Sequence, residues 1–97
     1  MKILKFKIDK HNTVPNMVEM PKDADVIHVD VIGEDIFLWA EVNPENEKET
    51  REYWIYDTGV EIPNDPDFFY FGTCKRKSLI TDEWFVHHVY EKVKGRE

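Results

Sequence analysis

The feature that most restricts the fold is a pair of β-rich runs separated by a short turn. Residues 26–32 are dominated by β-branched side chains, and residues 36–42 alternate in polarity or size with the period of a strand. The intervening Gly33-Glu34-Asp35 is a turn sequence, and it is too short to return the chain as a parallel strand. The two runs therefore predict an antiparallel β-hairpin.

The same alternation predicts which side chains of this hairpin share a face. The aliphatic face of residues 36–42 consists of Ile36, Leu38, Ala40 and Val42, and the opposite face carries Phe37, Trp39 and Glu41. An unbroken strand over residues 26–32 groups three further β-branched side chains, Ile27, Val29 and Val31. The other face of residues 26–32 carries Val26, His28, Asp30 and Ile32. In residues 36–42, Phe37 and Trp39 are expected to alternate with core residues, so the aliphatic face there is the expected core face.

Five more segments have strand character. Within residues 4–8, apolar side chains alternate with lysines, and the short run of residues 18–20 is followed by Pro21. Residues 52–56 and 68–73 are rich in aromatic side chains. Residues 83–93 fit a helix as well, but their β-branched and aromatic side chains favour a strand. Such a set of short strands predicts one all-β domain over residues 1–97, a small antiparallel sandwich or partly open barrel. An α+β fold with a C-terminal helix is the alternative.

Charge is distributed unevenly along the chain. The 97 residues include 20 acids and 13 bases, with a net charge of −7. Between Asp23 and Asp67 there are 14 acids and only two bases, Lys48 and Arg51. Such a surface repels nucleic-acid backbone, which excludes general binding to DNA or RNA. The one compact exception is the basic triplet, Lys75-Arg76-Lys77.

Cysteine content and hydropathy indicate a cytoplasmic protein. Cys74 is the single cysteine, so no internal disulfide is expected. No apolar run approaches the ~20 residues of a membrane-spanning helix. The N-terminal residues 1–7 alternate apolar side chains with lysines, unlike a signal peptide.

Seven segments spread over residues 26–91 form a set of strand-and-turn signatures. The longest are Leu38-Trp39-Ala40-Glu41-Val42-Asn43-Pro44 and Phe85-Val86-His87-His88-Val89-Tyr90-Glu91. The others are residues 26–29, 49–52, 58–59, 62–63 and 70–73. Together these segments resemble a family of short phage and prophage proteins of unassigned function. The resemblance implies a phage origin and an accessory role, and it supplies no reaction. The expected location is the host cytosol.

The sequence predicts no catalytic residue, no cofactor and no metal site. Nothing in the spacing places a histidine beside Cys74, and no nucleophile motif surrounds it, so a structural role is expected. His87 and His88 point to opposite faces of a strand and cannot chelate one ion together. His28 and Asp30 share a face, and His88 would join them only if their strands were adjacent.

Binding is better supported than catalysis. The aromatic side chains exceed what one small core readily hides, so the chain is expected to form a homo-oligomer unless two packed sheets absorb them all. A phosphate-bearing ligand needs cations, and a planar one needs rings to stack on. The residues predicted to bind a nucleotide-type ligand are Arg51, Trp54, Tyr56, Lys75, Arg76 and Lys77.

Three functions follow from these features. The favoured one is a non-enzymatic binder that sequesters a nucleotide-type signal of host defence. The second is an acidic inhibitor or DNA mimic that acts on a host enzyme, suggested by the acids between Asp23 and Asp67. The third is a small metal- or histidine-dependent enzyme that uses His28, Asp30 and His88.

Overall fold

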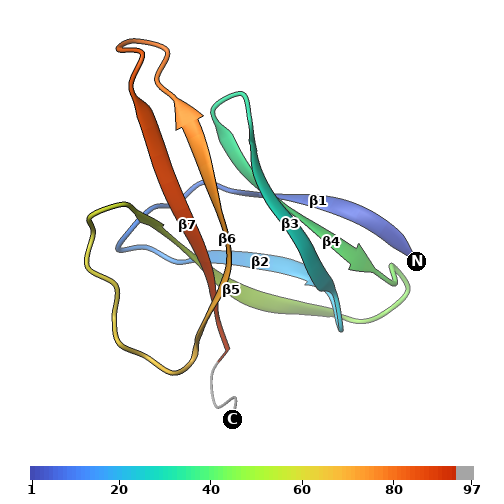
Figure 1. The fold of residues 1–97 in the computed structure, drawn as a ribbon. Coiled ribbons are helices and arrows are strands. Elements are labelled where there is room, and N and C mark those ends of the chain that lie inside the picture. The colour runs from blue at the N-terminus through green and yellow to red at the C-terminus, as the bar shows by residue number, and fades with distance from the viewer. Residues whose placement is uncertain (94–97) are drawn as a thin grey trace.

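The computed structural model describes residues 1–93 and shows an all-β protein of seven strands (Figure 1). The strands are β1 (Lys2–Ile8), β2 (Asn16–Pro21), β3 (Asp25–Ile32), β4 (Asp35–Val42), β5 (Lys48–Asp57), β6 (Phe68–Lys77) and β7 (Trp84–Lys92). The all-β prediction is confirmed, and the alternative with a C-terminal helix is wrong because β7 occupies that segment. Among the described residues, no helix is long and apolar enough to span a membrane.

The strands form two antiparallel sheets. One sheet has the order β1-β4-β3, and the other has the order β2-β5-β7-β6. The predicted hairpin is β3–β4, which Gly33 and its neighbours connect, and a second hairpin joins β6 to β7. The sheets approach each other closely between β3 and β6, where a Cβ on Gly72 would lie 3.5 Å from the Cβ of Val29. This two-layer arrangement is that of a small sandwich.

The core lies between the two sheets. The aliphatic face of β4 is buried as predicted, and none of its side chains is more than 2% exposed. The opposing sheet contributes fully buried Tyr53 and Ile55 from β5 and Val89 from β7. Side chains that alternate with these residues lie on the outer faces of the sheets.

The predicted face of β3 is wrong at Ile27. The pairing with β4 shifts between Val26 and His28, which leaves Ile27 as the extra residue of a β-bulge. Val26 and Val29 are consequently both buried, whereas Ile27 is half exposed. A bulge breaks the period of two, so strict alternation cannot predict the face beyond it.

Two strands are longer than the segments predicted for them, residues 52–56 and 68–73. β5 begins at Lys48, inside a polar stretch, and β6 continues through the basic triplet to Lys77. Lys75 and Lys77 are paired with Val86 and Trp84 of β7. The hydrogen bonds between strands are made by the backbone and do not require an apolar side chain on the outer face. These charged residues can therefore belong to strands.

Gly33 is expected to be required for the β3–β4 turn. Its φ of +65° lies in the left-handed region, and there is open space where a Cβ would project. Gly33→Ala should lower the free energy of unfolding by about 1 kcal/mol because of backbone strain alone. Urea denaturation measures this loss, and Gly33→Asn should lose less because asparagine tolerates this conformation better. Equal stability of the alanine variant and the wild type would contradict the assignment.

Candidate functional site

The outer face of the four-stranded sheet carries a cluster of aromatic rings. This ring cluster consists of Trp54, Tyr56, Phe68, Tyr70 and Tyr90. The rings of Trp54 and Tyr56 are nearly parallel, with 6.0 Å between centroids, and Phe68 lies edge-on to both. Tyr90 contacts the rings of Tyr56, Phe68 and Tyr70 at 5.5–6.2 Å.

Strand register brings these rings together. Tyr90 in β7 is the cross-strand partner of Trp54 in β5 and of Tyr70 in β6. Cross-strand partners point to the same face of a sheet, and their side chains touch. The ring cluster is therefore a consequence of pairing three strands in this register.

A hollow of about 390 Å³ adjoins the ring cluster. Its walls are Asn12, Thr13, Trp54, Tyr56, Glu61, Pro63, Asp65, Phe68 and Lys92. Among the residues that the structure describes, Lys92 is the only cation of these walls. Lys92 Nζ lies 3.6 Å from Asp65 Oδ2 and 5.6 Å from the centroid of Phe68. The hollow combines aromatic surface with one cation and two carboxylates, those of Glu61 and Asp65. Its size is within the range of small-molecule sites.

The residues predicted to bind a ligand do not form one group. Trp54 and Tyr56 lie together in the ring cluster, whereas Lys75 and Lys77 both lie over the ring of Trp84 near the far end of the β6–β7 hairpin. Arg76 points to the other side of β6. There its guanidinium lies 3.9 Å from a Glu34 carboxylate oxygen and 5.1 Å from the ring centroid of Phe85.

Arg51 forms a largely buried ion pair with Glu91. Its Nε and Nη2 donate to the two carboxylate oxygens of Glu91 at 2.9 and 2.8 Å, and Nη1 donates to the backbone oxygen of Ala24 at 2.6 Å. Burial opposes the charge of Arg51, but the hydrogen bonds and charge of Glu91 outweigh it and raise the pKa of Arg51. The guanidinium thus links β5 to β7 and to the segment before β3.

Replacing only one residue of the Arg51–Glu91 ion pair is expected to destabilise the protein strongly. Arg51→Met leaves the buried Glu91 carboxylate without its partner, which should lower the free energy of unfolding by about 3 kcal/mol. The double variant Arg51→Met/Glu91→Leu should recover much of that loss because it leaves no unpaired charge. Urea denaturation of both variants measures the difference.

A matched control uses an exposed ion pair. Lys7 and Asp35 lie 3.6 Å apart with about half of each side chain exposed, so Lys7→Met should lower stability by less than about 1 kcal/mol. A loss for Arg51→Met no greater than that for Lys7→Met would contradict the structural role of Arg51.

Cys74 is buried in the core, as its expected structural role requires. Desolvation, and secondarily the negative charge of Asp30, raise the pKa of the Cys74 thiol to about 11. Its cross-strand partner is His87, but no hydrogen bond joins them. The thiol is therefore protonated at neutral pH and poorly nucleophilic.

Cys74 is expected to resist thiol reagents while the protein is folded. At pH 8 the native protein should release almost no thionitrobenzoate from DTNB, because the Cys74 thiol is protonated and inaccessible to the reagent. After unfolding in urea it should release one equivalent. Absorbance of the released chromophore provides the measurement. Rapid stoichiometric reaction of the native protein would show that Cys74 is accessible and activated.

The histidine group suggested by the sequence does not assemble. His28 Nε2 lies 3.5 Å from Asp30 Oδ2 on the three-stranded sheet. His88 belongs to the other sheet, where its ring nitrogens bond the hydroxyl groups of Thr58 at 2.8 Å and Thr73 at 3.0 Å. His87 and His88 do occupy opposite faces of β7, as predicted, and His87 faces the core.

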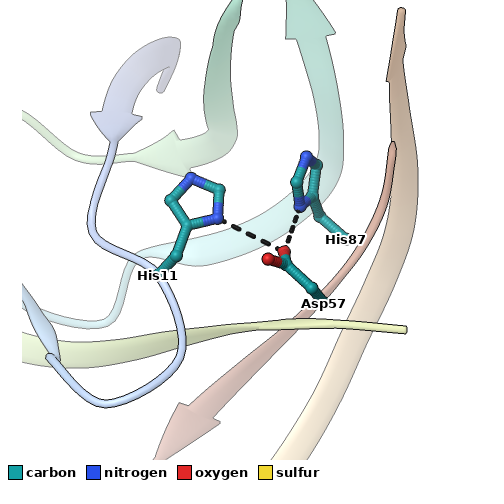
Figure 2. Close-up of side chains that lie close together, drawn as sticks. All are labelled: His11, Asp57 and His87. Carbon is teal, nitrogen blue, oxygen red and sulfur yellow. Dashed lines mark hydrogen bonds and ion pairs between the residues drawn. The ribbon is translucent and has the colours of Figure 1, made fainter. Parts of the chain in front are cut away.

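A different histidine–aspartate cluster forms from His11, Asp57 and His87 (Figure 2). Asp57 Oδ1 lies 2.5 Å from His87 Nδ1 and 3.4 Å from His11 Nδ1. Asn12 completes the arrangement, since its amide nitrogen donates to Asp57 Oδ2 at 3.3 Å and its side-chain oxygen accepts from the Asp57 backbone at 3.0 Å. Three separated segments thus meet at one carboxylate: the β1–β2 connection, the end of β5, and β7.

The protonation of this cluster follows from its surroundings. Burial lowers the pKa of His87 and outweighs the opposing effect of Asp57, so His87 is neutral and its Nδ1–H donates to Asp57. Its Nε2 is buried and has no hydrogen-bond partner. Burial opposes ionisation of Asp57, but hydrogen bonds from His87, Asn12 and His11 outweigh it and lower the pKa of Asp57. Asp57 is therefore a carboxylate.

Sequence reasoning missed this cluster because its members are distant along the chain. The available signal was strand pairing, since Asp57 and His87 are direct cross-strand partners of β5 and β7. His11 had no such signal. It reaches the cluster because the backbone N–H of Asn12 donates to the backbone oxygen of Ile55 at 2.6 Å.

Fold and site together define a small β-sandwich with an aromatic hollow on one outer face and a histidine–aspartate cluster at the end of β5. The chain belongs to a family described as a domain of unknown function, DUF7352, whose model matches residues 1–97. No curated protein and no solved structure matches the chain. Membership fits the expectation of an uncharacterised family.

Proposed function

We propose that this protein is a phage accessory protein that binds and sequesters a small nucleotide-type signal of host defence in the host cytosol. The observation that carries the proposal is the aromatic hollow beside Trp54 and Tyr56. All three rings of its walls are shielded from solvent to some extent: Tyr56 is buried, and Trp54 and Phe68 are half-buried. Rings arranged in this way favour a ligand with a planar base.

The polar groups of the hollow suit the rest of a nucleotide. The Lys92 ammonium, which lies 3.6 Å from Asp65 Oδ2 in the free protein, can also donate to one phosphate, and the Glu61 carboxylate can accept hydrogen bonds from ribose hydroxyl groups. Two carboxylates repel a ligand that carries several negative charges. The balance favours a cyclic nucleotide or cyclic dinucleotide-like signal, with a single charge per phosphate, over a nucleoside triphosphate.

The lining also favours binding over catalysis. Among the described residues, the walls of the hollow contain no histidine, cysteine or serine. A ligand there would meet no activated nucleophile and no imidazole base. Sequestration needs only affinity, and stacking together with a few polar contacts supplies it.

Self-association would bring more cations to the ligand. Lys75 and Lys77 lie on the same outer face as the ring cluster but at the other end of the β6–β7 hairpin, whose tip exposes Leu79 by 79% and Ile80 by 91%. In a homo-oligomer joined through these hairpins, the lysines of one copy approach a ligand bound to another. Exposed apolar side chains at the tip are consistent with such a contact.

Calorimetry against cyclic nucleotides and cyclic ADP-ribose isomers tests the proposal. At least one compound should bind to the wild type. Trp54→Ala should raise the Kd of that compound by about tenfold, because a stacking surface worth ~1–3 kcal/mol is lost. Sedimentation with and without that compound measures the expected association.

The matched control is Trp39→Ala. Trp39 is a half-buried tryptophan on the outer face of the other sheet, where it contacts the rings of Phe37 and His28. Its removal should leave the Kd unchanged. Absence of heat with every compound, or equal weakening by both substitutions, would refute ligand binding at the ring cluster.

A further inference from the structure

The histidine–aspartate cluster presents the ligand atoms of a metal site. The two imidazole nitrogens and the carboxylate of His11, His87 and Asp57 lie within 4.8 Å of one another. Two histidines and one carboxylate are a ligand set of zinc and of other first-row divalent ions. None of these residues belongs to the lining of the aromatic hollow, so the cluster is a separate site.

The three ligand atoms lie within 4.8 Å of one another, and the His87–Asp57 contact must lengthen for them to surround one ion. Tetrahedral ligands about 2.0 Å from zinc lie about 3.3 Å from one another. The distance from Asp57 Oδ1 is 3.4 Å to His11 Nδ1 and 2.5 Å to His87 Nδ1. Both imidazoles already direct the same ring nitrogen at one carboxylate (Figure 2), so an ion would take the place of the Nδ1 protons after small side-chain rotations.

The carboxylate ligand is held in position by Asn12. Asn12 donates to Asp57 Oδ2 and accepts from the Asp57 backbone, which leaves Asp57 Oδ1 directed at the two imidazoles. Hydrogen bonds of this kind to a ligating carboxylate orient it and support metal affinity. Asn12 itself has a φ of 61°, and its backbone N–H is bonded to Ile55 of β5. The loop therefore presents His11 from a fixed position.

An ion can reach this cluster from one side. His87 is fully buried, but the side chains of His11 and Asp57 are 31% and 38% exposed. Three protein ligands leave a fourth tetrahedral position for water on the open side. The net charge of −7 also favours the approach of a cation.

We infer that His11, Asp57 and His87 bind a divalent transition-metal ion, with zinc as the best match. The ion crosslinks the β1–β2 connection, the end of β5 and β7. Asn12 joins the two sites, since it supports Asp57 and also lines the aromatic hollow, so the ion stiffens one wall of that hollow. The inference does not depend on nucleotide binding.

Metal titration of untagged full-length protein tests the inference. After treatment with EDTA and dialysis, calorimetry with zinc chloride should give one bound ion per chain and an increase in Tm. Cobalt chloride should give an absorption spectrum with ligand-field bands of nitrogen and oxygen coordination. His11→Ala, a change at a partly exposed residue, should remain folded by circular dichroism and lose both the binding and the Tm increase. Asp57→Asn should do the same.

The matched control is His28→Ala. His28 also pairs with an aspartate, Asp30, but on the exposed face of the other sheet, and within residues 1–93 no third ligand joins this pair. This variant should retain one zinc ion with unchanged Kd. The inference is overturned if the wild type binds neither zinc nor cobalt, if His11→Ala keeps the wild-type stoichiometry and Kd, or if His28→Ala abolishes binding.

Discussion

The register of β7 between β5 and β6 is the constraint on which the rest of this structure depends. On the inner face of β7, the register places His87 opposite Asp57. It also brings Glu91 to Arg51, with which Glu91 forms an ion pair. On its outer face it sets Tyr90 between Trp54 and Tyr70. A slip of one residue would exchange the two faces, which would bury the rings and expose the buried ion pair. The same hydrogen-bonded strand thus supports core, hollow and histidine–aspartate cluster.

Charged groups serve different purposes on the two sides of this sheet. Between the sheets, Arg51 and Glu91 satisfy one another with two charge-assisted hydrogen bonds, and this geometry makes their burial tolerable. Outside, Lys75, Lys77 and Lys92 lie against aromatic rings and remain in contact with solvent. Two of these surface lysines also pair with acids, Lys92 with Asp65 and Lys77 with Asp82, but none is enclosed by the core as Arg51 is. The proposed binding function therefore depends on the outer face.

Strand positions were predictable from this sequence to a large extent, and the grouping of functional side chains much less so. The period of two located the β3–β4 hairpin and the aliphatic face of β4, because those strands bury one face only. The bulge at Ile27 could not be predicted, because a run of β-branched residues has the same composition with or without a bulge. The strand predicted over residues 68–73 also continues through the basic triplet, whose backbone pairs with β7.

Residue types by themselves determined that this chain forms antiparallel strands, that it is acidic, and that it has more aromatic side chains than a minimal core needs. These properties are local, because alternation, turn chemistry and charge act over a few residues. Only the tertiary structure decided that Arg51 pairs with Glu91 and that His11, Asp57 and His87 meet. Those contacts join segments 30 to 46 residues apart, and a contact at that separation depends on sheet order and register, which no local pattern specifies.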